Sequence, residues 1–469
     1  MHHSLTVIVP VHNQLEQLKV CCEIVLANFK NDYPDGQLIV VDMNSNDGTE
    51  AWLSEQADIS YIAIEDEVCK SQAYNAALEY ATGEMILFLN CDAYITDHTI
   101  IRLEEYLYSN ESVAAVGPVL SKVEMDNLQR YLGDMPKLKD IFQAREFSDQ
   151  LYREKHLELP YNTNFLYDSC LLIKKDIILS IGNFDIKYYA NSMEDIDLSL
   201  RLIKAGYQLL VIPSVFVYND QHWLFVDRGY DHYDSYVLMT DVFEEKWKFN
   251  FFYSNNMRVD LLRFVDLKKS NIAVLEAGCG MGANFTYIKS INPKAYLCGV
   301  ELSDRTAFFA QKHADVRNED LEKIKVPEWD DKFDYIIMGD IIEHLIDPWS
   351  ALKKLRALLK SDGCIIASIP NIMNAVTMYH ILSGKFTYAK SGILDRTHMR
   401  FFTKYEIEKM FNDCGCDVEI LGYNQIWDRN DEVNEFEKEI MSMKSLNVDP
   451  DEFNAMQYII KATKKKVDN

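Results

Sequence analysis

The sequence of 469 residues has no apolar run long enough to cross a bilayer. Its most apolar stretch, 209–217, contains a proline and is well short of the ~20 residues that a membrane-spanning helix requires. The first residues, MHHS, lead directly into a strand pattern and lack the charged and apolar regions of a signal peptide. The sequence therefore predicts a cytoplasmic protein without a transmembrane segment, and it leaves peripheral contact with a membrane open.

Basic side chains are also scarce. The chain has 48 Lys and Arg against 73 Asp and Glu, which gives a net charge of −25. A charge of this sign repels phosphate backbones, so no nucleic-acid partner is expected. The ten cysteines include no C-x-x-C pair, and several lie in apolar runs, where a reduced cysteine behaves as a small hydrophobic side chain. Neither a zinc site nor a disulfide framework is predicted from them.

The chain is rich in apolar residues and alternates regularly between strand and helix patterns. Hydrophobic residues make up 48% of a sequence whose length corresponds to two or three domains. Such alternation is typical of α/β domains built on mostly parallel sheets, and it starts twice, near residues 5 and 272. We expect domains at 1–228 and 265–469, joined by a packed helical connector at 229–264.

The first domain is expected to contain strands at 5–9, 37–41, 61–64 and 85–89. Strands of the second domain are expected at 295–300, 335–338 and 364–368. The chain should close with a strand pair at 417–421 and 456–462, and the acidic segment 430–453 should be an insertion between them.

Polar residues follow the first strands, at the edge of a parallel sheet where nucleotides bind. Pro10 and Asn13 end the first strand, and Asp42, at the end of the second, can accept a hydrogen bond from a base or ribose. Asn75 precedes the strand that ends in Asn90-Cys91-Asp92. A carboxylate at the end of a buried strand suits Mg²⁺ or Mn²⁺, which prefer oxygen ligands and keep positions open for substrate phosphates.

With Gly182-Asn183-Phe184-Asp185 and Glu194-Asp195-Ile196-Asp197 added, this series of motifs resembles family 2 glycosyltransferases of the GT-A fold. The resemblance covers roughly residues 4–225. It implies an N-terminal nucleotide-sugar-binding domain, a diphosphate bridged by Mn²⁺ or Mg²⁺, and inversion at the anomeric carbon. It assigns the nucleotide-sugar donor to Pro10, Asn13, Asp42, Asn75 and Asp92.

The same resemblance assigns the metal and the catalytic base. Asn90-Cys91-Asp92 stands where the family carries D-x-D, and the change of the first acid to Asn leaves Asp92 as the expected metal ligand. His222 is placed like a downstream histidine that contacts the metal or the diphosphate. Inversion needs a carboxylate to take the acceptor hydroxyl proton, which the resemblance assigns to Asp195, with Glu194 as the alternative.

Structural roles are the alternative for several of these residues. Asn13 and Asp47-Gly48 are also typical of ordinary turns, and Asp185 or Asp197 could cap a helix. His222 alone would more often be a surface or core histidine.

The second domain opens with Glu276-Ala277-Gly278-Cys279-Gly280-Met281-Gly282, in which glycines allow a cofactor to approach the backbone. Glu301 ends the next strand, where an acid can hold a ribose diol. Asp320 lies in a third loop, and Asp340 follows a further strand. A dinucleotide-binding enzyme of the nicotinamide class shares the glycine spacing and is the alternative.

This succession resembles class I S-adenosylmethionine-dependent methyltransferases over roughly residues 255–469. The resemblance implies a Rossmann-like domain in which the loop from Glu276 through Gly278, Gly280 and Gly282 cradles the methionine end of the cofactor. It assigns Glu301 to the ribose, Asp320 to the adenine amine and Asp340 to the border of the methyl group. The expected closing strand pair agrees with the family's antiparallel edge pair.

Methylating a sugar hydroxyl requires removal of a proton with a high pKa, for which a histidine or a bound metal is usually needed. His344 is one candidate base. His398 is another, because the segment around it should overhang the methyl site. Shaping the cofactor pocket is the alternative role for His344, and a structural role is the alternative for His398.

Together these patterns predict a bifunctional enzyme that transfers a sugar from a nucleotide-sugar donor to a glycan, lipid-linked or protein-linked acceptor. It would then methylate the glycan product with S-adenosylmethionine. Two alternatives stay open: the domains act on unrelated substrates, or one of them has become a non-catalytic binding module.

Overall fold

The computed structural model describes residues 2–66, 68–123, 127–130, 135–138, 140–190, 192–219, 232–425, 430–443 and 449–465. Contacts divide the chain into two compact units, Met1–Met257 and Arg258–Asn469. The division falls inside 229–264, the segment expected to be a connector. Its helices α8 (His232–Trp247) and α9 (Phe251–Ser254) belong to the first unit, and α10 (Val259–Leu262) belongs to the second. Within the described residues, no helix is long and apolar enough to span a membrane.

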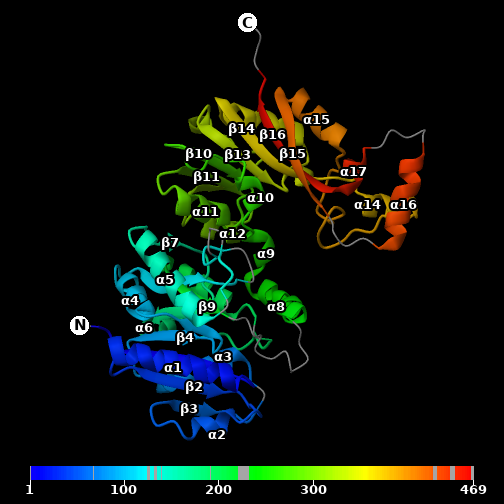
Figure 1. Cartoon of the computed structure of the whole chain (residues 1–469). Coiled ribbons are helices and arrows are strands. Elements are labelled where there is room, and N and C mark those ends of the chain that lie inside the picture. Colours follow the sequence, from blue (N-terminus) through cyan, green and yellow to red (C-terminus); the bar gives the residue numbers. More distant parts are fainter. Residues whose placement is uncertain are drawn as a thin grey trace. The chain divides into compact units, whose positions relative to one another are not determined.

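The first unit is built on one mixed sheet with the strand order β3-β2-β1-β4-β8-β6-β9-β5, and β7 pairs with β9. Figure 1 labels β2, β3, β4, β7 and β9 of this sheet. β1 pairs in parallel with both β2 and β4, so the strand order reverses at β1. Such a switch point opens a crevice at the carboxyl ends of the strands. The strand bounds are β1 Leu5–Val11, β2 Gln37–Asp42, β3 Ser60–Ala63, β4 Met85–Leu89, β5 Ala93–Ile95, β6 Val113–Leu120, β7 Tyr161–Asn162, β8 Cys170–Lys174 and β9 Gln208–Asn219.

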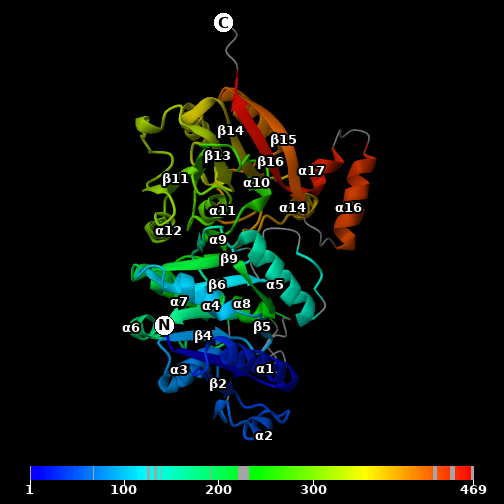
Figure 2. The same cartoon turned by 60° about the vertical axis from the view of Figure 1, so that its left-hand side comes forward.

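Central strands of this sheet are buried on both faces because helices cover them. β1 and β4 are apolar along nearly their whole length, as expected of parallel strands between two helical layers. The strands expected at 5–9, 37–41, 61–64 and 85–89 are confirmed, with ends that move by at most two residues. The helices, several of which Figure 2 shows against the sheet, are α1 Leu15–Asp32, α2 Thr49–Leu53, α3 Lys70–Tyr80, α4 Thr99–Leu107, α5 Ile141–Lys155, α6 Lys175–Ser180 and α7 Glu194–Lys204.

Helix α8 is fixed to the first unit by a buried carboxylate. Asp197 of α7 is fully buried and accepts hydrogen bonds from the Trp247 indole at 2.9 Å and from Arg201 Nε at 2.8 Å. Lys246 approaches the same carboxylate at 2.7 Å. Asp197 thus acts as a structural anchor inside α7, which explains why 232–247 packs with the first unit.

The second unit contains a sheet of seven strands among the described residues, in the order β12-β11-β10-β13-β14-β16-β15. The first five strands are parallel, and β16 is antiparallel to both β14 and β15. The expected closing pair and the insertion between its strands are confirmed. The strand bounds are β10 Ala273–Ala277, β11 Tyr296–Glu301, β12 Asp315–Asn318, β13 Phe333–Gly339, β14 Leu359–Pro370, β15 Cys416–Gln425 and β16 Ala455–Lys464.

Helices cover both faces of this sheet. One apolar cluster joins Leu275 of β10 to Leu352 and Met410 on one face, and another joins Val274 to Phe285 and Leu262 on the other. Alternate residues of β10 therefore point to opposite layers, as strand geometry requires. The helices are α11 Ala283–Ile291, α12 Asp304–Ala310, α13 Pro348–Leu358, α14 Ala375–Leu382, α15 Lys404–Asp413, α16 Asp431–Ser442 and α17 Pro450–Asn454, and the short 3₁₀ turns are η2 Pro327–Trp329 and η3 Ile342–His344.

The described parts of the insertion, 430–443 and 449–453, form a small core of their own with α14. Val433 and Phe453 form this core with Ala375 of α14, and Figure 1 shows α14, α16 and α17 grouped together.

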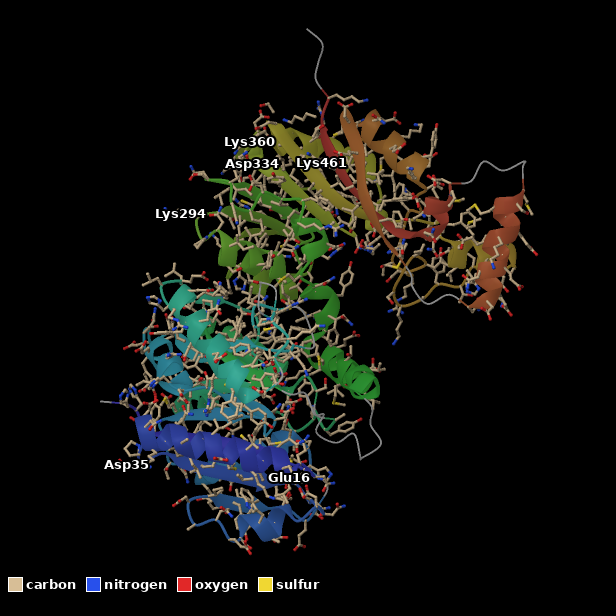
Figure 3. The ribbon with its side chains drawn as sticks, viewed as in Figure 1. Glu16, Asp35, Lys294, Asp334, Lys360 and Lys461 are labelled. Carbon is tan, nitrogen blue, oxygen red and sulfur yellow. The ribbon has the colours of Figure 1, made fainter. Side chains whose placement is uncertain are left out.

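At the amino end of β13, buried Asp334 pairs with Lys360 at 2.8 Å and Lys269 at 2.7 Å, and Figure 3 shows Asp334 beside Lys360. This ionic cluster stabilises the amino end of β13.

Candidate functional site

The loops after β1 and β2 are tied together at the switch point of the first sheet. Asn13 adopts a φ of 51°, and its backbone N–H donates to Ser45 Oγ at 3.0 Å. The Asp42 carboxylate is buried and accepts from the Ser45 N–H at 3.0 Å. Pro10 lies buried in β1, paired with Val41 of β2. The residues that the sequence assigns to the donor on these two strands therefore lie together, and Asn13 and Asp42 also fix the loop conformation.

Asn75 of α3 holds a turn. Its Nδ2 donates to the Phe184 carbonyl at 2.9 Å, and its Oδ1 accepts from the Phe184 N–H at 3.0 Å. Because both ends of the amide are engaged, the structure gives Asn75 a positioning task for the segment that precedes α7. Donor binding by Asn75 stays a prediction.

The motif Asn90-Cys91-Asp92 forms the turn between β4 and β5. The Asp92 residue is 6% exposed, and Asn90 Oδ1 is buried with no hydrogen-bond partner among the described residues. A carboxylate and an orphaned amide oxygen two residues apart are oxygen ligands that Mg²⁺ and Mn²⁺ prefer. These residues therefore fit a hard divalent ion. His222, the other expected ligand, lies outside the described residues.

A buried ionic cluster stands beside the predicted base. Lys70 Nζ lies 2.8 Å from Asp168 and 3.0 Å from Glu194, and all three residues are at most 8% exposed. Burial opposes the charge on Lys70, but Asp168 and Glu194 more than offset it and raise the Lys70 pKa. Burial also raises the pKa of Glu194, against the lowering effect of Lys70. Glu194 is thus a partner in an internal ion pair.

Asp195 occupies a different environment at the beginning of α7. Its Oδ1 accepts from the Ile196 N–H at 2.7 Å, and its Oδ2 accepts from the Asp168 N–H at 3.4 Å. It is 8% exposed, whereas Glu194 is 1% exposed. The α7 N-terminus therefore presents two carboxylates with different contacts: Glu194 pairs with Lys70, and Asp195 accepts from two backbone N–H groups. Sequence reasoning missed Lys70 and Asp168, because their sequence neighbours carry no motif.

In the second unit, the glycine-rich loop follows β10 with three left-handed residues. Gly278, Gly280 and Gly282 have φ values of 71°, 52° and 81°. A Cβ added at Gly278 would stand 2.1 Å from Ile341 Cδ1, so the loop also requires glycine for close packing. The strand order reverses between β10 and β13, which places this loop at the switch point of the second sheet.

Glu301 is the last residue of β11, and Asp320 follows β12 at the same edge of the sheet. Glu301 Oε2 accepts from the Gly280 N–H at 2.8 Å, and Oε1 accepts from the Ser303 N–H at 3.0 Å. Asp320 lies after β12 and pairs with Lys323 at 2.8 Å. The structure therefore brings the end of β11 onto the glycine loop, with Asp320 one strand further along the sheet.

A chain of hydrogen bonds runs from the glycine loop to Asp340. Glu276 Oε1 accepts from Asn284 at 2.6 Å, and Asn284 Oδ1 accepts from the backbone N–H of Arg258 at 2.8 Å. The Arg258 guanidinium pairs with Asp340 at 2.8 Å, and Ser368 donates to the same carboxylate at 2.8 Å. Asp340 has a φ of 56°. These bonds position Asp340, and Arg258 is a partner that no sequence motif indicated.

Glu276 itself retains an orphaned oxygen. Its Oε2 is buried and has no hydrogen-bond partner among the described residues. Burial raises the pKa of Glu276 to about 8, against the lowering effects of Asn284 and Arg258. An acceptor of this kind beside a glycine loop fits the ammonium end of an amino-acid-containing cofactor.

We predict that Glu276→Gln changes the pH dependence of stability. An unfolded Glu titrates near 4.3, so the folded wild type has a raised pKa and loses stability as pH rises from about 4.3 to about 8. Glutamine cannot ionise, so the variant should gain on the wild type by up to ~1.4 kcal/mol per pH unit across this window. Urea unfolding of the full chain at pH 5 to 9, without cofactor, measures the difference.

Exposed Glu328, which pairs with Arg317 at 3.3 Å, provides the matched control. Glu328→Gln should give a difference from wild type that hardly varies with pH. An equally flat difference for Glu276→Gln would contradict the raised pKa.

His344 and His398, the two predicted bases, lie together. Their rings are 4.8 Å apart, and each Nδ1 faces a backbone carbonyl, that of Thr397 at 3.2 Å for His344 and that of Ile393 at 2.9 Å for His398. Burial, followed by the neighbouring His398, lowers the pKa of His344. A neutral imidazole that donates through Nδ1 presents an Nε2 lone pair, which can take a proton or bind a metal.

Comparison with known proteins finds a different family in each half of the chain. Residues 6–182 match the family described as Glycosyl transferase family 2, and residues 249–420 match the one described as Methyltransferase domain. The chain carries a family 2 glycosyltransferase domain followed by a methyltransferase domain. The expected fold class is confirmed: an N-terminal GT-A domain precedes a Rossmann-like domain.

Individual relatives match only in part. The uncharacterized protein y4gI of Sinorhizobium fredii is 23% identical over 56% of this chain and 30% of its own length. The N-acetylglucosaminyl-diphospho-decaprenol L-rhamnosyltransferase of Mycobacterium tuberculosis is 29% identical over 29% of this chain and 48% of its own length. The chain thus spans less than half of either relative. The structure of mannosyltransferase PcManGT from Pyrobaculum calidifontis, with GDP-Man and Mn²⁺, covers 49% of this chain and 59% of its own at 21% identity and a TM-score of 0.34.

Proposed function

We propose that this chain is a bifunctional enzyme. Its first domain transfers a sugar from a nucleotide-sugar donor to a glycan, lipid-linked or protein-linked acceptor with inversion, and its second domain O-methylates the glycan product with S-adenosylmethionine. The observation that carries the proposal is the pairing of two family matches with two switch-point sites, one on each sheet. A cytoplasmic location belongs to the same proposal.

In the glycosyltransferase domain, Asp195 would act as the base that takes the proton from the acceptor hydroxyl. In support, Glu194 forms an ion pair with Lys70, whereas the Asp195 carboxylate accepts hydrogen bonds from backbone N–H groups, which hold its orientation. Asp92, with the Asn90 amide oxygen, would hold Mn²⁺ or Mg²⁺, which supplies charge neutralisation at the donor diphosphate when bound. Asn13, Asp42 and the loops they fix would bind the nucleoside.

In the methyltransferase domain, the residues around the glycine loop would bind and orient the cofactor. Gly278, Gly280 and Gly282 would admit it close to the backbone, and Glu276 Oε2 would accept from its ammonium group. Glu301 would hold the ribose. When bound, S-adenosylmethionine supplies an electrophilic methyl group, and His344 or His398 would take the proton from the acceptor hydroxyl.

We predict that Asp92→Asn abolishes metal-dependent sugar transfer and leaves S-adenosylmethionine binding intact, because the lost metal carboxylate lies in the other domain. Release of nucleoside diphosphate from a panel of nucleotide sugars with added Mn²⁺ measures the first activity. Calorimetry measures cofactor binding. Loss of both properties in a folded variant would contradict the assignment of Asp92.

The order of the two reactions is also testable. Two sites on one chain meet a shared glycan at a high effective concentration, so methylation should be faster on the glycosylated product than on the unextended acceptor. Mass spectrometry of a timed reaction with both donors gives the order. Methyl groups that appear first on the unextended acceptor or on the nucleotide sugar would overturn it.

A further inference from the structure

Three potential metal ligands meet at the carboxyl end of β13 in the methyltransferase domain. Glu343, His344 and His398 each offer a ligand atom, and these atoms lie within 4.8 Å of one another. His398 Nε2 is 4.0 Å from Glu343 Oε1. Ligand atoms around a shared ion at ~2.1 Å stand roughly 3 to 3.5 Å apart, so small side-chain rotations would complete the site.

Glu343 provides an independent observation that points to a bound cation. Its side chain is 1% exposed, and neither carboxylate oxygen has a hydrogen-bond partner among the described residues. A buried carboxylate without a hydrogen-bond partner is unfavourable unless it binds a cation or takes up a proton.

Hydrogen bonds within the protein orient the two histidines for metal binding. Each ring faces a backbone carbonyl through Nδ1, which leaves Nε2 as the ligand atom. The Glu343 carbonyl accepts from the N–H groups of Met399 at 2.8 Å and Arg400 at 3.0 Å. This pair of bonds ties the segment that carries His398 to the turn that carries Glu343 and His344.

We propose that Glu343, His344 and His398 bind a divalent first-row transition-metal ion. Two imidazoles and one carboxylate form a ligand set that suits Zn²⁺, Fe²⁺ and Co²⁺ better than Mg²⁺, which prefers oxygen ligands alone. Three protein ligands leave coordination positions open. This site differs in ligand type and domain from the Asp92 site.

This metal site would take part in the proposed methyl transfer, so its catalytic role rests on the proposed function. It stands next to the glycine loop, because Ile341, two residues before Glu343, packs against Gly278. An acceptor hydroxyl bound at an open position of the ion would have a lowered pKa and would release its proton to solvent water near neutral pH, before its oxygen attacks the methyl group. His344 and His398 would then serve as metal ligands, and the metal would replace the histidine base considered above.

Co²⁺ binding to the full chain tests the proposal, because Co²⁺ bound by histidine has visible absorption bands. The titration is done on chelator-treated Asp92→Asn protein in excess Mg²⁺, so that the oxygen-rich site of the first domain does not contribute. One equivalent of Co²⁺ should bind. Adding Glu343→Gln should weaken binding by about 100-fold, and adding His398→Ala should do the same.

His380→Ala is the matched control, since His380 is an exposed histidine on α14 of the same domain. It should leave Co²⁺ affinity unchanged. Thermal unfolding without metal verifies that each variant is folded, and if Glu343→Gln does not fold, His398→Ala decides. No bound Co²⁺ in the parent protein, or equal affinity in the parent and the folded ligand variants, would overturn the proposal and leave Glu343 as a buried protonated acid.

Calorimetric binding of S-adenosylmethionine, measured on the same parent protein, separates this proposal from the proposed function. Co²⁺ binding without cofactor binding would retain the metal site and reject the methyltransferase activity. Cofactor binding without Co²⁺ binding would reject the metal site and leave the proposed methyltransferase function standing.

Discussion

Asp195→Asn should lower kcat for sugar transfer by ~10²–10⁴-fold, because an amide cannot take the proton from the acceptor hydroxyl. Asparagine has nearly the same shape, and its Oδ1 can still accept from the Ile196 N–H that the carboxylate binds at 2.7 Å. The affinity for the nucleotide sugar should therefore stay close to that of the wild type. Initial rates at saturating donor and acceptor, together with calorimetric donor binding, measure the two effects separately.

Glu194→Gln distinguishes the two neighbouring acids. This variant leaves Lys70 with Asp168 as the remaining acid of its buried cluster, so the first domain should unfold at a lower temperature. Asp195→Asn should lower the unfolding temperature less, because Lys70 keeps both Asp168 and Glu194. Glu16, an exposed acid on α1 labelled in Figure 3, gives the control, and Glu16→Gln should affect neither turnover nor stability. If donor affinity fell as far as turnover in Asp195→Asn, Asp195 would be a binding residue and the base would lie elsewhere.

Local periodicity predicted much of this fold, because both sheets have central parallel strands that read as continuous apolar runs. β4 begins and ends at the residues expected, and the antiparallel pair β15 and β16 lies where the sequence placed it. The segment 229–264 was harder to interpret. Its helical character is visible in the sequence, but the contact of Asp197 with Trp247, which fixes α8 to the first unit, joins residues 50 positions apart.

Motif reasoning found residues at strand ends and missed their partners. Asp42, Glu276 and Glu301 lie at the carboxyl ends of strands, so the sheet topology alone predicts that they gather at one edge of each sheet. Arg258 reaches Asp340 across 82 positions, and its neighbours in the sequence show no pattern that would indicate the pairing. Long-range ion pairs of this kind depend on tertiary packing, which periodicity does not encode.

Glu343 illustrates a different limit. The sequence drew attention to His344 beside it and to His398, but the value of Glu343 depends on its burial without a hydrogen-bond partner. Glutamate side chains are usually exposed, so nothing in the sequence indicated a buried one here. Only the structure could identify this acid as the third member of the cluster.

Gly280→Leu should abolish S-adenosylmethionine binding, with a rise in Kd of about 100-fold or more, which corresponds to at least ~2.7 kcal/mol. The residue has a φ of 52°, and its N–H donates to Glu301, so Gly280 lies in the loop beside the space proposed for the cofactor. A branched side chain would fill that space. Calorimetry on the full chain measures the cofactor affinity, and nucleotide release measures sugar transfer, which should be retained.

Gly384 supplies the matched control because it shares the left-handed backbone conformation and lies outside the glycine loop. Its φ is 77°, and a Cβ added there meets nothing within 4 Å. Gly384→Leu therefore carries a similar left-handed backbone cost of ~1–2 kcal/mol but should bind the cofactor normally. The difference between the two variants isolates the effect of side-chain volume at the loop. Wild-type affinity in a folded Gly280→Leu protein would place the cofactor away from this loop and reject the assignment of Glu276, Glu301 and their glycines as a binding site.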